Sequence, residues 1–126
     1  MLLNDLPDNY HSQAIISVTE ALASYEEVYI NVNGKDCTRQ VFPSNTIDIG
    51  FSYITAHIIP KAPCARDENL FFLATDEKLA TDWGQQWLEA FTKHWAAFLT
   101  SRQRELKKHG LLFVQVPLAE NPLLEY

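Results

Sequence analysis

The residue with the clearest chemical potential is Asp5, which follows the apolar stub Met1-Leu2-Leu3 and precedes Pro7. Pro7 cannot donate to a strand ladder, so the stub is typical of the last part of a strand, with Asp5 at its carboxyl end. A carboxylate in that position can accept hydrogen bonds from both hydroxyls of a ribose. The competing interpretation is an Asx turn before Pro7, in which the carboxylate only caps backbone amides.

Other kinds of site chemistry find little support in the sequence. The four histidines and two cysteines show neither Cys-x-x-Cys nor His-x-x-x-His spacing, so we expect no metal site. No serine stands in a Gly-x-Ser-x-Gly elbow, which argues against a serine hydrolase. The four glycines are isolated from one another, so the sequence contains no glycine-rich phosphate cradle.

Composition limits the class of protein. The chain has 126 residues, 47% of them hydrophobic, which predicts a single domain, and its formal charge of −6 argues against a nucleic-acid partner. No apolar run approaches the ~20 residues needed to span a bilayer, so we expect no membrane partner. Two cysteines and no secretory pattern at the N-terminus indicate a reduced, cytoplasmic setting.

The first half of the chain alternates strand and helix signals. After Asp8, apolar residues recur at helical spacing from Ile15 to Tyr25 and predict a helix. Residues 28–32 are β-branched and aromatic and predict a strand that ends at the turn signal Asn33-Gly34. Residues 46–51 alternate apolar with small or polar side chains and predict another strand, and residues 70–74 suggest a short buried piece.

The clearest element is a long amphipathic helix between Thr81 and His109. Its apolar stripe, at steps of three and four residues, contains Trp87, Phe91, Trp95, Phe98, Leu99 and Leu106. We expect Lys107, Lys108 and His109 to complement the carbonyl end of the helix dipole, and Gly110 to end the helix in the left-handed conformation.

Residues 111–116 are almost continuously apolar and are followed by Pro117, as in a strand covered on both faces. The whole order of strand, helix, strand, strand, helix, strand predicts an α/β fold with a parallel sheet.

Three blocks of residues stand in a distinctive order: Leu3-Asn4-Asp5-Leu6-Pro7, then Phe42-Pro43-Ser44-Asn45-Thr46-Ile47-Asp48 with Phe51-Ser52 and His57, and finally Trp95-Ala96-Ala97-Phe98-Leu99 with Arg102, Glu105-Leu106 and Gly110. Together they resemble the SABATH family of S-adenosylmethionine-dependent carboxyl methyltransferases. The resemblance implies a partial Rossmann-like methyltransferase sheet, mostly parallel, that lacks the family's first strand and its glycine-rich turn. Residues 1–126 would form a single partial domain, without the family's C-terminal cap.

The resemblance also implies site residues. It gives Asp5 and Leu6 contacts with the adenosine of S-adenosylmethionine, and it aligns Asp36 and Cys37 with a Ser-Phe pair that flanks the adenine. The competing interpretation makes Asp36 and Cys37 plain loop residues. Cys37 offers a smaller surface than an aromatic ring.

On the substrate side, the resemblance aligns His57 with a histidine that binds the substrate carboxylate, although Ile58 replaces the tryptophan donor beside it. Tyr53 is a candidate for the wall of the acyl pocket. Both residues have an alternative structural role. The implied reaction is direct methyl transfer to a small carboxylic acid, which needs no general base because the acid is ionised at pH 7.

These observations lead to three hypotheses. The first is a fragment or truncated relative of such a methyltransferase, inactive as this isolated chain and with weak or absent binding of the cofactor. The second is a non-catalytic, degenerate module that pairs with another chain, including a second copy of itself, through an exposed sheet edge. The third is a different nucleotide-binding α/β protein in which Asp5 holds the ribose of another cofactor.

Overall fold

The structure is a computed structural model that describes residues 1–5, 8, 10–53, 56, 58–59, 61–64 and 80–116. Its elements, in chain order, are β1 (Leu2–Asp5), α1 (His11–Ala21), β2 (Asn31–Gly34), β3 (Ile47–Tyr53), α3 (Asp82–Glu105) and β4 (Leu106–Gln115). This order confirms the predicted α/β class. Leu6, Pro7, His57 and the predicted buried piece at 70–74 lie outside the described residues.

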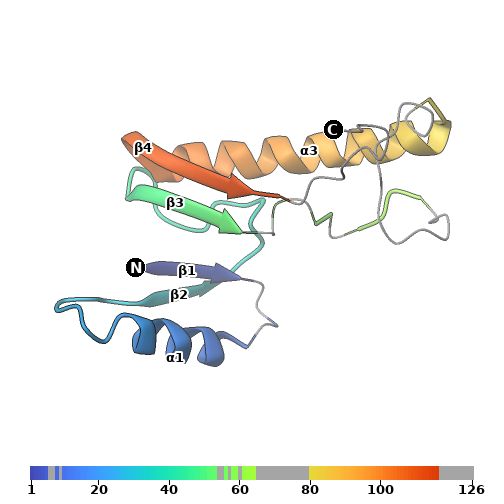
Figure 1. Ribbon diagram of the computed structural model, residues 1–126. Helices are drawn as coiled ribbons and strands as arrows, with labels where there is room; N and C mark the ends of the chain where they lie inside the picture. The colour runs from blue at the N-terminus through green and yellow to red at the C-terminus, as the bar shows by residue number, and fades with distance from the viewer. Residues whose placement is uncertain are drawn as a thin grey trace, which may run out of the picture.

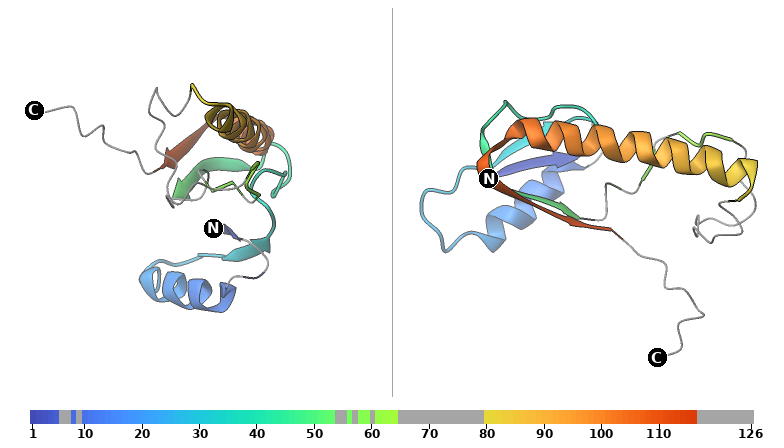
Figure 2. Two further views of the ribbon diagram at one scale, coloured as in Figure 1. Left: turned by 90° about the vertical axis from the view of Figure 1, so that its right-hand side faces the viewer. Right: turned by 90° about the horizontal axis from the view of Figure 1, so that it is seen from above.

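The strands form two parallel pairs. Strand β1 pairs with β2, and β3 pairs with β4. All four strands run in the same direction, and their order in space is β2, β1, β3, β4, so that β1 and β3 are the inner strands (Figure 1). Helix α1 lies beside the β1–β2 pair, whereas α3 lies beside the β3–β4 pair (Figures 1 and 2). No pairing joins the inner strands β1 and β3 in the described part of the chain.

Helix α3 is fixed by its cap and by one buried stripe. The Thr81 hydroxyl accepts a hydrogen bond from the Gly84 amide at 3.0 Å, and Asp82 stands in the first turn, where a negative charge is favourable. The buried residues recur at steps of three, four and seven: Gly84, Trp87, His94, Phe98, Ser101 and Glu105. The predicted stripe was therefore partly wrong, because Leu99 remains 39% exposed.

The predicted end of this helix was also wrong. Helix α3 ends at Glu105, and Lys107 and Lys108 belong to β4. The Thr46 amide donates to the Glu105 carbonyl at 2.9 Å, so pairing with the chain before β3 replaces the next helical turn. The left-handed residue is His109, with φ 69°, and not a glycine.

A register shift accompanies this early start of β4, because Ile47 pairs with Leu106 whereas Ile49 pairs with Leu111. Within this irregular stretch, the Lys107 ammonium reaches both carboxylate oxygens of Asp48 at 2.8 Å.

The β1–β2 pair also differs from the prediction. Helix α1, which connects the two strands, ends at Ala21 and does not reach Tyr25, and β2 occupies Asn31–Gly34 and not residues 28–32. The expected turn at Asn33-Gly34 is absent because both residues pair with β1. The Asn33 side chain then donates to the Val41 carbonyl at 2.7 Å, which fixes the course of the following loop.

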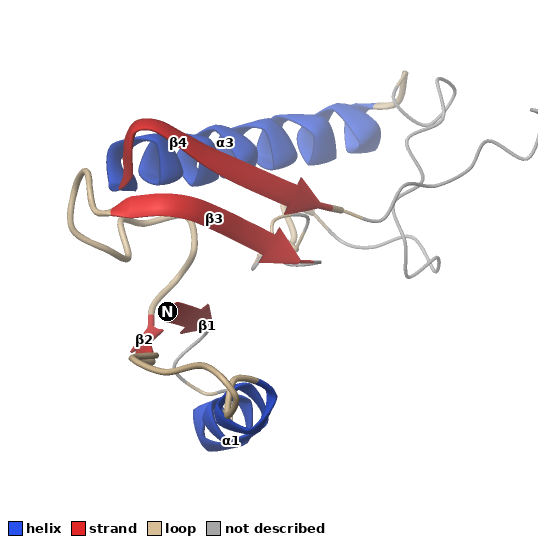
Figure 3. Cartoon of the chain, turned by 60° about the vertical axis from the view of Figure 1, so that its left-hand side comes forward, coloured by secondary structure: helices blue, strands red, loops and turns tan. Residues whose placement is uncertain are grey.

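One face of the β3–β4 pair is open. Side chains that alternate along both strands remain more than half exposed on it: Ile49, Phe51, Tyr53, Leu111 and Phe113. The Phe51 and Phe113 rings stack at 5.0 Å across the register position that pairs them. The expectation that the last strand is covered on both faces is therefore wrong for the described part of the molecule, where α3 covers one face only (Figure 3).

Candidate functional site

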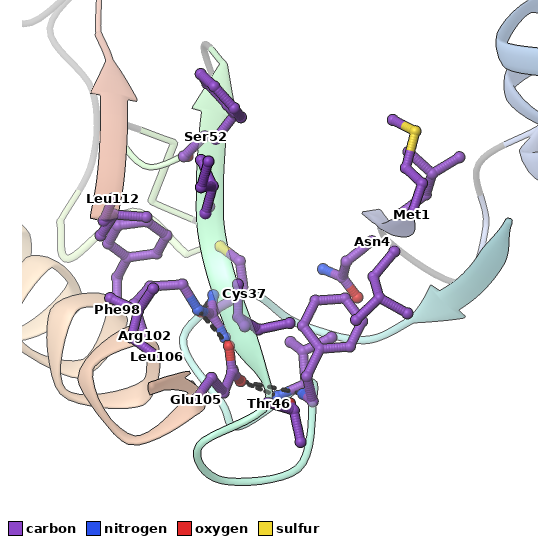
Figure 4. A pocket seen from close by; sticks show the side chains of 18 of the residues that line it. Met1, Asn4, Cys37, Thr46, Ser52, Phe98, Arg102, Glu105, Leu106 and Leu112 are labelled. Atoms are coloured by element: carbon purple, nitrogen blue, oxygen red, sulfur yellow. Dashed lines mark hydrogen bonds and ion pairs between the residues drawn. The ribbon is translucent and has the colours of Figure 1, made fainter. Parts of the chain in front are cut away.

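A cavity of about 850 Å³ lies between the two inner strands. Residues 1–5 form one wall, and residues 46–53 with Leu112 form the other. Figure 4 shows Met1 and Asn4 on one side, facing Ser52, Phe98 and Leu112 on the other. The cavity therefore reaches the carboxyl ends of parallel strands, where open α/β sheets bind their ligands.

Asp5 occupies the carboxyl end of β1 and lines this cavity. It pairs in register with Gly34, so the loop that begins at Lys35 starts directly beside it. The Asn4 side chain donates to the Lys35 carbonyl at 3.0 Å and ties the ends of the two strands together. The arrangement places Asp5, an exposed residue, at the tip of an anchored strand.

Asp36 and Cys37, the predicted adenine neighbours, lie in different surroundings. The Asp36 carboxylate accepts hydrogen bonds from the Thr38 amide and hydroxyl, both at 2.8 Å, and it does not line the cavity. Partial burial opposes ionisation, but these hydrogen bonds and the positive charge of Arg39 outweigh it, so the pKa of Asp36 is lowered. Asp36 thus shapes its loop as an ionised carboxylate.

Cys37 is half-buried and lines the cavity. Burial raises the pKa of its thiol, and the neighbouring carboxylate of Asp36 adds to this effect. The thiol is therefore protonated at neutral pH and presents a small, weakly polar surface to the cavity.

The substrate-side residues are placed less completely. Tyr53 ends β3, is 68% exposed and lines the same cavity. His57 and Leu6 lie outside the described residues, while Ile58 is exposed. The structure thus brings Asp5, Cys37 and Tyr53 around one cavity.

The sequence reasoning assigned no role to two charged residues in the cavity wall, Arg102 and Glu105. The Glu105 carboxylate is 2% exposed and accepts from the amides of Val41 and Phe42. Arg102 donates to both oxygens of this carboxylate at 2.8 Å.

Arg102 also holds the loop that contains Cys37. Its guanidinium donates to the Cys37 carbonyl at 2.8 Å and to the Arg39 carbonyl at 3.0 Å, and it lies over the Phe98 ring. We call Arg102, Glu105 and their backbone partners in residues 37–42 the clasp. In the sequence, the pattern that could have indicated the clasp is an Arg and a Glu three residues apart on the apolar side of a helix.

The described residues contain no group of three or more His, Cys, Asp or Glu side chains placed to hold a metal ion. None of their helices combines the length and the apolar character needed to cross a bilayer.

No model of a known sequence family matches the chain, and no curated protein matches it. A solved structure does: a loganic acid methyltransferase with SAH superimposes with a TM-score of 0.64 at 17% identity. The match covers 97% of this chain and 35% of that one. The chain therefore has an α/β fold of the methyltransferase type. The chain spans about a third of the length of the methyltransferase it matches.

Proposed function

We propose that this chain is the adenosine-facing central part of an S-adenosylmethionine-dependent methyltransferase that methylates a small carboxylic acid. The observation that carries the proposal is the position of Asp5, at the carboxyl end of an inner parallel strand and in the wall of the cavity. The similarity of fold to a methyltransferase described with SAH supports the choice of cofactor.

The described residues fit the adenosine part of this cofactor in two respects. Asp5 stands at a strand tip in the cavity wall, the position from which a carboxylate can accept from the two ribose hydroxyls, with Leu6 beside it in the chain. Cys37 offers a wall for the adenine, whereas the Asp36 carboxylate is engaged by Thr38 and would act mainly through the shape of its loop.

When bound, S-adenosylmethionine supplies a methyl group on a sulfonium, which a carboxylate oxygen can displace directly. In this proposal Tyr53 and His57 orient the acid, and no residue removes a proton, because the acid is already ionised at pH 7. Catalysis would come from alignment and exclusion of water, which contribute up to ~7–11 kcal/mol in favourable cases. We expect the isolated chain to be inactive, because its strand tips are exposed.

An NMR titration of the full chain with S-adenosylhomocysteine tests the proposal. We expect weak, saturable binding with a dissociation constant on the order of 1 mM, about −4 kcal/mol. The amides of Asp5, Lys35 and Cys37 should shift, whereas NAD should leave them unchanged. Shifts confined to other residues, or equal shifts with NAD, would contradict the proposed cofactor, and methyl transfer to small carboxylic acids by this chain alone would contradict the expected inactivity.

A second candidate function is the non-catalytic module that pairs with another chain. The observation that favours it is that, among the described residues, each inner strand is paired on one edge only, and its other edge lies beside the cavity. The hydrogen bonds from Thr38 to the Asp36 carboxylate also favour this second function, because they hold the predicted adenine contact within its own loop.

A further inference from the structure

Residues 35–42 form the loop that follows β2 and belong to no helix or strand of the structure. Four of them line the cavity: Lys35, Cys37, Val41 and Phe42. The loop therefore forms part of the wall that we assign to adenine. Because no strand pairing fixes it, its position depends on the groups that bind it from outside.

The last turn of α3 holds the backbone of this loop. The buried Ser101 hydroxyl donates to the Thr38 carbonyl at 2.9 Å. The clasp holds the carbonyls on either side of Thr38 and the two amides at the end of the loop. Figure 4 shows Arg102 and Glu105 beside Cys37. Helix α3 thus binds the backbone of the loop and leaves the loop side chains free to face the cavity.

These hydrogen bonds are largely shielded from water. Ser101 is 7% exposed, and the side chains of Arg102 and Glu105 are 13% and 2% exposed. Hydrogen bonds to charged groups are stronger than neutral ones, and a buried partner that loses its bond costs free energy. The loop is therefore already ordered before a ligand arrives, and the ligand does not have to supply the free energy of ordering it.

We propose that Ser101, Arg102 and Glu105 are positioning residues of the adenosine site, which set the affinity for the cofactor through the loop of Cys37. This inference rests on the proposed function and adds to it the residues that hold the adenine wall in place. The apparent dissociation constant rises in proportion as the binding-competent conformation becomes rarer. A loop that is in place for about a fifth of the time would weaken binding about fivefold.

The variant Arg102→Lys separates the position of the loop from the charge of the clasp. Lysine keeps a positive charge for the Glu105 carboxylate, so the buried carboxylate is not left without a countercharge. Its ammonium cannot reproduce the planar fork that reaches Glu105 and two loop carbonyls at once. The matched control is Arg104→Lys on the same turn of α3, because Arg104 is exposed and does not line the cavity.

The first readout is the reactivity of the Cys37 thiol, which needs no cofactor. Cys64→Ser leaves Cys37 as the only thiol of the chain, and its alkylation by iodoacetamide reports how well the loop is held, because Cys37 is half-buried. The Arg102 charge lowers the pKa of this thiol, and lysine retains that charge. We expect alkylation to be about threefold or more faster in Arg102→Lys and unchanged in Arg104→Lys.

The second readout is the affinity of the folded chain for S-adenosylhomocysteine, measured by NMR titration. Arg102→Lys should weaken binding about fivefold or more, whereas Arg104→Lys should not. Ser101→Ala removes only the bond to the Thr38 carbonyl and should weaken binding about twofold. This milder variant decides the question if Arg102→Lys does not fold. A residue that only stabilised the fold would shift the urea midpoint without changing the affinity of the folded molecules.

The failure of this inference and the failure of the proposed function are distinguishable. If the unchanged chain binds S-adenosylhomocysteine and Arg102→Lys and Ser101→Ala bind it equally well, this inference alone is overturned. Unchanged alkylation of Cys37 in Arg102→Lys would also overturn it. No response of the unchanged chain to S-adenosylhomocysteine would overturn the proposed function, and this inference with it.

Discussion

Glu105→Gln is expected to be strongly destabilising, because Glu105 is the most buried charged residue in the described part of the chain. The side chain keeps its shape but loses the charge that the Arg102 guanidinium contacts at 2.8 Å. The glutamine side chain also brings an NH2 donor into a site where every partner of the Glu105 carboxylate is itself a donor, including the amides of Val41 and Phe42. The variant therefore leaves Arg102 and at least one backbone donor without full compensation.

The magnitude follows from burial. Removing one partner of a buried ion pair costs about 3–5 kcal/mol, because the other charge remains desolvated. The side chain of Glu105 is 2% exposed and that of Arg102 is 13% exposed, so water can compensate Arg102 in part. We expect a loss of ~3 kcal/mol in the free energy of unfolding, at the lower end of that range.

The assay is urea unfolding followed by tryptophan fluorescence, with Glu89→Gln as the matched control on the same helix. Glu89 pairs with Lys93 at 2.7 Å, but both side chains are mostly exposed, so the control should leave the unfolding midpoint unchanged. A double-mutant cycle with Arg102→Met should give a coupling energy above ~1.5 kcal/mol if the two residues act as one unit. A loss below ~1 kcal/mol for Glu105→Gln would refute the reasoning that the clasp is a buried, fully used network.

Three further predictions concern stability and association. Because the pKa of Asp36 is lowered in the folded state, its carboxylate stabilises the fold above its ordinary pKa, and the stability difference from Asp36→Asn should shrink as pH falls below about 4 in urea titrations. Gly110→Ala should cost about 1–3 kcal/mol, more than Gly50→Ala, because its added Cβ meets two backbone carbonyls at 3.0 and 3.1 Å whereas the closest contact at Gly50 is a leucine methyl. Phe51→Thr should reduce dye binding and self-association in light scattering, since this ring is 78% exposed; unchanged dye binding would contradict an open apolar face.

The sequence was sufficient to predict the order of elements and the place of Asp5, because both depend on local signals. Asp5 follows an apolar stub and precedes Pro7, and the structure places it at the end of β1 as predicted. The long helix was equally clear from its apolar spacing, although its predicted end was wrong. These features need only a few neighbouring residues to be specified.

The errors arise where distant segments decide the conformation. Helix α3 ends at Glu105 because Thr46 pairs with it across 59 positions, and helical propensity in the following residues does not compete with that bond. Asn33 lies in β2 because β1 pairs with it, although Asn33-Gly34 is a turn signal. The clasp was missed for the same reason, since Arg102 and Glu105 find their partners more than sixty residues away.

The most direct test of the central claim is the affinity for S-adenosylhomocysteine of Asp5→Asn against that of the unchanged chain, measured by NMR titration. The control is Glu89→Gln, whose exposed carboxylate pairs with Lys93 on α3 and does not line the cavity. Loss of a charged hydrogen-bond acceptor for the ribose costs about 1.5–3 kcal/mol, so Asp5→Asn should weaken binding by about tenfold or more and Glu89→Gln should not. Equal affinity of Asp5→Asn and the unchanged chain would contradict the assignment of Asp5 as the ribose acceptor.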